Sequence, residues 1–210
     1  MLMKSIKKGR FLKIGNLKIP VIEIFEGWRS IVIKTRVKGR CYAVKILKKK
    51  AKYSYREAVA LKKASKVRAA PKVFRIFRRC ILMEFLSGPF FEKYVMNEKD
   101  IKKVRKLIIK ILEKALKLDS LKVTNLELSR AHKHIILHKN NPFIIDFGRV
   151  SFEKGKNFEK LMHYLFFNPS SNIAKRLRYI FNLTSDDIKN IKNLLKEKRK
   201  KTIPLYLESL

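Results

Sequence analysis

Two stretches of the sequence carry residues suited to phosphate chemistry. "FIIDFG" is an apolar run that ends in Asp146 beside a glycine. A carboxylate there is well placed to ligate Mg²⁺ bridging nucleotide phosphates. Upstream, the polar stretch "NLELSRAHKHIIL" (125–137) offers the carboxylate Glu127 and the histidines His132 and His134. The two stretches together predict a metal-binding aspartate next to a catalytic loop.

A lysine in an apolar strand is the second chemical signal. "YAVKI" places Lys45 among apolar residues, where an unpaired charge would be costly. Glu57 follows twelve positions later in a predicted helix and is a plausible partner. The pair would hold Lys45 against the α- and β-phosphates of a nucleotide. The alternative is an edge-strand lysine that faces solvent.

A glycine turn lies upstream, between two predicted strands. "FEGWRSIV" has the spacing of a phosphate-covering loop and keeps Gly27 and Val32 of that pattern, with Ser30 at a glycine position. One glycine suffices to bring backbone N–H groups close to phosphates. A plain hairpin glycine is the simpler interpretation of this motif alone.

A strand that runs into a glycine turn could contact a base. "ILMEFLSG" would offer the Glu84 carbonyl and the Leu86 N–H to an adenine edge, with Met83 behind. Taken alone, this segment is an ordinary strand. The order of the motifs along the chain is more informative than any one of them.

In that order, the motifs resemble the protein-kinase-like superfamily. The similarity covers roughly residues 15–165 and is strongest to minimal archaeal predicted serine/threonine kinases related to the RIO and Bud32 groups. It implies an α+β, bilobal fold: a small β-rich N-lobe with one helix (1–86) and a reduced helical C-lobe (87–210), forming one domain. It also implies that ATP and Mg²⁺, or Mn²⁺, bind between the lobes.

The resemblance also implies roles for single residues. The γ-phosphoryl group of ATP would pass to a hydroxyl, with Glu127, Lys45 and Asp146 as catalytic residues. Asp146 would ligate the metal together with His134 or His132. The nucleotide would contact Gly27, Ser30, Val32, Lys45, Glu57, Met83, Glu84 and Leu86.

The catalytic loop departs from the family pattern. Asn125 stands at the usual His position, Glu127 at the Asp, and His132 at the Asn; alignment on "IIL" puts His134 there instead. Glutamate can still orient a hydroxyl, so we expect a moderate loss of rate. Neutral imidazole favours Mn²⁺, Zn²⁺ or Fe²⁺ over Mg²⁺. These histidines, and His138, could instead cap the loop or donate to phosphate.

Three functions therefore compete. The first is an atypical kinase acting on an unknown protein or small-molecule phosphoacceptor. The second is a pseudokinase that binds nucleotide without transferring phosphate. The third is a basic protein that binds nucleic acid, because 52 Lys and Arg against 17 acids give a net charge of +35. A general bias of surface charge could also explain that excess.

The remaining composition bounds the class of protein. A 210-residue chain with 46% apolar residues can bury a core. We expect no signal peptide and no membrane span, because no apolar run is long enough. Cys41 and Cys80 are expected to be buried free thiols, which suits the cytoplasm.

Elements of two kinds must position these residues. The first half predicts strands at 11–25 and 30–47, with a turn at "KGR", then a helix whose apolar stripe includes Ala58, Leu61 and Ala64. Two further strands precede "SGP". Asn97 is expected to cap a long helix, and "KNNP" to join two short strands. We expect the last three helices at 156–167, 172–182 and 186–200.

Overall fold

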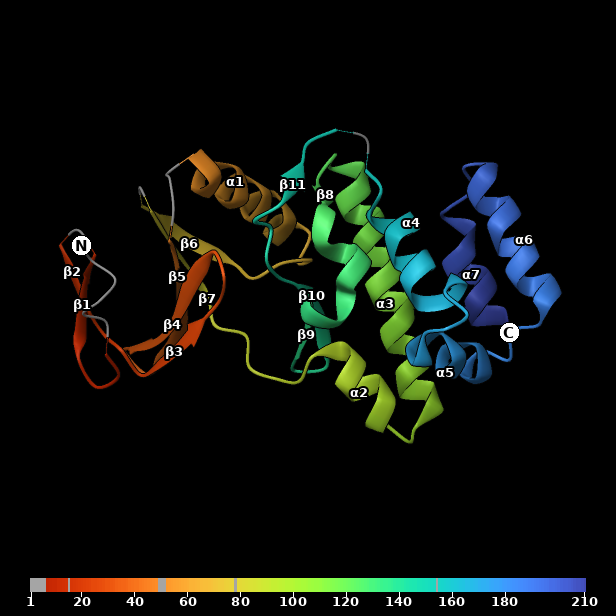
Figure 1. Ribbon diagram of the computed structural model, residues 1–210, viewed down its shortest axis with the longest axis horizontal. Helices are drawn as coiled ribbons and strands as arrows, with labels where there is room; N and C mark the ends of the chain where they lie inside the picture. Colours follow the sequence, from red (N-terminus) through yellow and green to blue (C-terminus); the bar gives the residue numbers. More distant parts are fainter. Residues whose placement is uncertain (1–6, 15, 49–51, 78, 154) are drawn as a thin grey trace.

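The computed structural model describes residues 7–14, 16–48, 52–77, 79–153 and 155–210 (Figure 1). It is an α+β structure: an antiparallel N-terminal sheet with one helix, followed by a mostly helical region. The two parts lie at opposite ends of the long axis (Figure 1). The last strand of the sheet ends at Glu84, and the first helix after it begins at Phe91.

The sheet has five strands in the order β3-β4-β5-β7-β6. A separate hairpin of two strands, β1 and β2, packs against one face through a cluster of aliphatic side chains. The turn between β4 and β5 has left-handed Lys38 and Gly39, as "KGR" predicts. The strands are β1 (Phe11–Ile14), β2 (Leu17–Pro20), β3 (Glu23–Glu26), β4 (Ser30–Val37), β5 (Arg40–Leu47), β6 (Val73–Ile76) and β7 (Cys80–Glu84).

Helix α1 (Lys52–Lys66) lies beside the sheet (Figure 1). Its predicted stripe of Ala58, Leu61 and Ala64 is fully buried, and joins the core that continues into the helical region. Small residues on this stripe let the helix approach closely, so its acidic residue Glu57 comes under the sheet rather than into solvent.

The second region is built on one long helix, α3, which supplies the centre of its core. The "KNNP" turn is confirmed, with left-handed Lys139 and Asn140 between its two strands. The helices are α2 (Phe91–Asn97), α3 (Ile101–Ser120), α4 (Asn157–Met162), α5 (Asn172–Ile180), α6 (Ser185–Lys196) and α7 (Thr202–Ser209), with a 3₁₀ segment η1 (Leu126–Lys133) and a π turn η2 (His163–Phe167). The short strands are β8 (Thr124–Asn125), β9 (Ile135–His138), β10 (Asn141–Ile144) and β11 (Val150–Ser151).

Two details of the helical region were predicted wrongly. Asn97 does not cap α3, because it is the last residue of the unforeseen helix α2 and its side chain donates to the Lys93 carbonyl. Asp100 caps α3 instead, accepting from the N–H of Lys103 at 3.2 Å. The helix expected to run to residue 200 ends at Lys196, and α7 follows it.

A capping box begins α6. The Thr184 hydroxyl accepts from the backbone of Asp187, whose carboxylate accepts from the Thr184 N–H. The thiols of Cys41 and Cys80 are free, as predicted, but they are half-buried rather than buried. No helix in the described ranges is long and apolar enough to span a membrane.

Gly88 fixes where the chain leaves the sheet. Its φ of +150° is in a region that L-residues avoid, and a Cβ there would lie 1.7 Å from the Leu137 carbonyl oxygen. The next residue, Pro89, accepts a hydrogen bond from the Leu137 N–H at 3.0 Å. The connection to the helical region is thus held tightly against β9.

Candidate functional site

Lys45 lies at the centre of the candidate site. On β5, Val44 and Ile46 face the aliphatic cluster under the β1–β2 hairpin, so Lys45 points to the opposite face of the sheet. Its ammonium contacts two carboxylates: Glu57 Oε1 at 2.5 Å and Asp146 Oδ1 at 2.8 Å. The lysine is therefore not the solvent-facing edge residue of the alternative interpretation.

This cluster joins three distant parts of the chain. Glu57 comes from α1, and Asp146 follows β10, 101 positions after Lys45. The side chain of Glu57 is buried, at 1% exposed, whereas that of Asp146 is 47% exposed. The site thus has a closed end at Glu57 and an open end at Asp146.

Two carboxylates sharing one ammonium set the electrostatics. Burial opposes charge on Lys45, but Glu57 and Asp146 outweigh it and raise the lysine pKa. Burial raises the pKa of Glu57 against the attraction of Lys45, because Glu57 is the more enclosed carboxylate. Desolvation would also raise the pKa of Asp146, yet the Lys45 ammonium holds it below the usual value. Asp146 is therefore the carboxylate that stays charged at the open end.

Backbone geometry aims Asp146 at this site. The residue has a left-handed φ of +60°, and the Gly148 N–H donates to its Oδ1 at 3.3 Å. The Phe147 side chain is fully buried in the core that spans both regions. Because Phe147 is anchored inward, Asp146 turns outward toward Lys45.

Asn125 connects the polar loop to Asp146. It is fully buried, and its Nδ2 donates to the Asp146 carbonyl at 3.1 Å. Its Oδ1 accepts from the Glu127 N–H at 2.9 Å, which caps the start of η1. The single side chain thus fixes both Asp146 and the backbone of Glu127.

A polar pair, the buried Asn157 and the half-buried Asp119, supports Asn125 from behind, and the sequence analysis missed it. Asn157 Oδ1 accepts from the Asn125 N–H at 2.8 Å, and Asn157 Nδ2 donates to Asp119 Oδ1 at 2.7 Å. Asp119 also accepts from the N–H groups of Asn157 and Phe158. The only sequence signal was a polar pair flanking the loop, at positions 119 and 157, which no short motif includes.

Glu127 lies at the rim of the site. Its side chain is 21% exposed, and Oε1 is 3.6 Å from Arg149 Nε. Lys160, another residue that the sequence analysis missed, donates to the Leu126 carbonyl at 3.3 Å. Burial and the Arg149 charge lower the pKa of Lys160, while Glu127 raises it. The carboxylate therefore lies among cations and is not free.

The two candidate metal-side histidines have different surroundings. His134 is buried, and no described residue hydrogen-bonds its Nδ1. Burial lowers its pKa, while the charges of Asp146 and Glu127 act to raise it, so it lies near both carboxylates. The ring of His132 stacks on Tyr164, with centroids 6.2 Å apart. His138 lies apart from them, its Nδ1 bonded to the backbone of Ser87.

The predicted nucleotide contacts are distributed along the sheet. Gly27 makes the β3–β4 turn, where its N–H donates to the Ser30 carbonyl at 2.9 Å. Val32 pairs directly with Lys45 across β4 and β5. The turn therefore leads into β4, the strand that pairs with the strand carrying Lys45.

The segment predicted to contact adenine covers the end of β7 and the connection after it. Met83 pairs with Ala43, and Glu84 pairs with Tyr42, both on β5. The Glu84 N–H is already bonded to the Lys72 carbonyl at 2.8 Å. Leu86 is half-buried in the connection that leads to Gly88. Met83 and Glu84 thus lie on the strand that pairs with β5 on the side opposite to β4.

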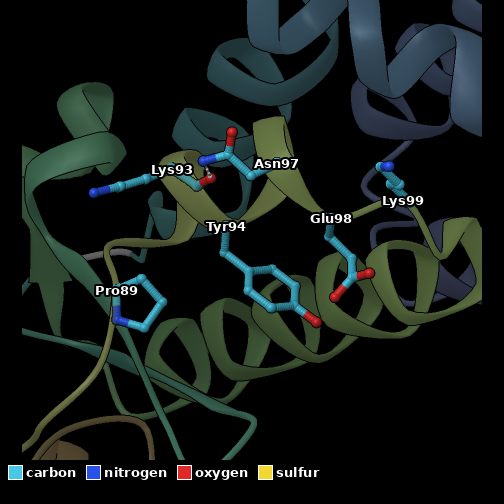
Figure 2. A pocket seen from close by; sticks show the side chains of 6 residues that line it. All are labelled: Pro89, Lys93, Tyr94, Asn97, Glu98 and Lys99. Atoms are coloured by element: carbon cyan, nitrogen blue, oxygen red, sulfur yellow. Dashed lines mark hydrogen bonds between the residues drawn. The ribbon is translucent and has the colours of Figure 1, made fainter.

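No group of three or more His, Cys, Asp or Glu side chains gathers into a metal site within the described ranges. Mg²⁺ in nucleotide sites is commonly held by one or two protein ligands together with phosphates. Asp146 and the unpartnered Nδ1 of His134 are compatible with that smaller set. Two surface hollows lie elsewhere: one of about 430 Å³ against α2 (Figure 2), and one of about 330 Å³ lined by residues of α2 and α3.

No protein-family model matches the chain, and no curated protein matches it.

Proposed function

We propose that the chain is an atypical ATP-dependent phosphotransferase with a protein-kinase-like bilobal plan. One observation carries the proposal: the buried Lys45 ammonium is shared by Glu57 and Asp146. Burying a charged cluster is costly, and apolar residues would fill the same volume at less cost. A chemical role for Lys45 would explain why a charged cluster, rather than apolar residues, occupies this position.

The residues divide the work by position. Glu57, at the closed end, holds the Lys45 chain in place. Lys45 can then contact phosphate oxygens, which take the place of Asp146 as its second anionic partner. Asp146 would bind the metal, and the buried Nδ1 of His134 would be its second protein ligand. When bound, that metal neutralises charge on the transferred phosphoryl group.

Glu127 would orient the acceptor hydroxyl by accepting its hydrogen bond. Asn125 fixes the backbone of Glu127 and that of Asp146 at once. The positioning of nucleophile and phosphate thus depends on one buried amide. Positioning contributes most of the catalysis in phosphoryl transfer.

Phosphoryl transfer from radiolabelled ATP tests this proposal. We expect autophosphorylation or phosphate release with Mg²⁺ or Mn²⁺, and a loss of at least about 100-fold in Asp146→Asn. Lys34→Ala is the matched control, because Lys34 is a strand lysine paired with Glu23 at 3.2 Å on the same sheet. Turnover that is equal in Asp146→Asn and wild type contradicts the proposal.

A second function, nucleotide binding without transfer, is favoured by the ion pair of Glu127 with Arg149. That contact occupies the carboxylate that would orient the acceptor. Turnover that falls in Glu127→Gln supports the enzyme. ATP binding that depends on Lys45, with negligible turnover unchanged by Glu127→Gln, supports the binding module.

A further inference from the structure

A row of lysines runs along one side of α3. The spacings are three or four residues, which align side chains on one helical stripe. At 1.5 Å per residue, the row is about 21 Å long. We call it the α3 lysine row, and its members are Lys103, Lys106, Lys110, Lys114 and Lys117.

Little negative charge offsets this row. Lys103 has an ion pair with Asp100 at 3.7 Å, but no carboxylate of the described residues lies within 4.0 Å of the other four ammonium groups. Glu113 is exposed on the same helix without an ion pair to a described residue. Arg68 adds a further charge near Lys114.

Lys114 is the one member of the row that is half-buried rather than exposed. Its Nζ donates to the Pro142 carbonyl and lies 4.4 Å from the centre of the Phe143 ring. Burial, and then the charges of Arg68, Lys117 and Lys110, lower its pKa to about 8. An anion bound along the row would relieve this repulsion.

The two surface hollows adjoin one end of the row. Lys103, Lys106 and Lys110 line the smaller hollow, and Tyr94 and Glu98 line both. In Figure 2 the ring of Tyr94 lies over α3 beside the Glu98 carboxylate. A half-buried aromatic ring is thus placed next to a line of cations.

From this arrangement we infer that the α3 lysine row and the Tyr94 hollows bind single-stranded nucleic acid. The row would contact successive phosphates, and Tyr94 would stack on an unpaired base. A duplex has phosphates but no free base face, so the aromatic ring favours a single strand. Binding here does not depend on a nucleotide at Lys45.

Fluorescence anisotropy with labelled 12-nucleotide oligouridylate and oligothymidylate tests the inference. Lys106→Glu with Lys110→Glu should weaken binding at least tenfold and reduce the slope of log K against log salt by about 1.4, since each single-strand phosphate contributes about 0.7. Lys189→Glu with Lys196→Glu makes the same charge change on exposed positions of α6, and should weaken binding less than threefold. Equal losses in both pairs would overturn the inference.

Substitutions of Tyr94 test base stacking without changing the charge of the surface. Tyr94→Ala should weaken binding of both oligonucleotides at least about fivefold with the salt slope unchanged, whereas Tyr94→Phe should bind like wild type. Thermal unfolding checks that each variant is folded. Absence of binding by wild type, or a duplex bound as tightly as the single strands with Tyr94→Ala unaffected, would overturn the assignment.

Discussion

Lys45 and Lys114 are both withdrawn from water, and they meet opposite surroundings. The Lys45 ammonium contacts two carboxylates, and they raise its pKa against burial. The Lys114 ammonium contacts a carbonyl and an aromatic ring, and burial together with the neighbouring cations lowers its pKa to about 8. The first lysine is neutralised within the fold. The second belongs to a surface whose charge must be met by solvent ions or by a partner.

The difference also separates two uses of the same residue type. A charge balanced inside the fold can be held still, which suits positioning of a small anion such as a nucleotide phosphate. A charge left unbalanced on a helix attracts polyanions over a distance and releases them in salt. A chain with net charge +35 contains both arrangements, so its net charge alone does not identify its partner.

The largest expected effect is that of Lys45→Met. It leaves Glu57 buried without its partner, which we expect to lower the free energy of unfolding by about 3–5 kcal/mol. Urea denaturation measures the loss. Lys34→Met removes a partly exposed ion pair and should cost no more than about 1 kcal/mol. Equal costs for the two variants would show that the Lys45 cluster is not the buried pair described here.

A compensating change separates stability from function. In Lys45→Met with Glu57→Leu, both buried charges are replaced by apolar groups, and such replacements are often neutral. We expect most of the lost stability to return in urea denaturation. This double variant therefore supplies a folded protein without the ammonium.

A smaller loss of stability is expected at Asn125, the residue of the helical region that holds Asp146 beside Lys45. Asn125→Ala removes the bonds to the Asp146 carbonyl and the Glu127 N–H, and should cost about 1–3 kcal/mol. Turnover should fall with it. Asn193→Ala on exposed α6 is the control and should be close to neutral in the same denaturation experiment. Equal losses of unfolding free energy in the two variants would show that Asn125 does not stabilise the site.

The smallest effect concerns the pH dependence at Lys114. Its pKa is lowered to about 8 on folding from the ordinary lysine value of 10.5, so the unfolded chain binds more protons between these values. Stability relative to Lys114→Met should therefore rise as pH rises from about 8 to 10.5. Partial exposure of the side chain makes the change small. If the unfolding free energies of wild type and Lys114→Met changed equally with pH across this range, the lowered pKa of Lys114 would be contradicted.

The closed end of the site was predictable from local sequence. Lys45 in an apolar strand needed a partner, and Glu57 is close enough in sequence for one strand and one helix to bring them together. Asp146 was expected as a metal ligand from "FIIDFG" itself, but its closeness to Lys45 was expected only through the order of motifs, since no periodicity relates positions 101 residues apart. Its left-handed backbone and the anchoring by Phe147 are tertiary features.

Other features had no unique sequence signal. Asn97 and Asp100 are both good caps, and only the short helix α2 decides between them by using Asn97 as its own last residue. The contacts of Asn125 with Asn157, and of Asn157 with Asp119, cross the loop and need the folded core to form. The spacing of the α3 lysine row is present in the sequence, but the helix was predicted from its apolar positions and the lysine positions were not considered.

The most direct test of the Lys45 cluster is calorimetric titration with ATP in the presence of Mg²⁺ or Mn²⁺. Wild type should bind, Lys34→Met should bind within about threefold, and Lys45→Met with Glu57→Leu should bind at least tenfold more weakly, because charged hydrogen bonds to phosphate are lost. Equal affinity of the double variant and wild type, or absence of binding by wild type with either metal, would contradict the account.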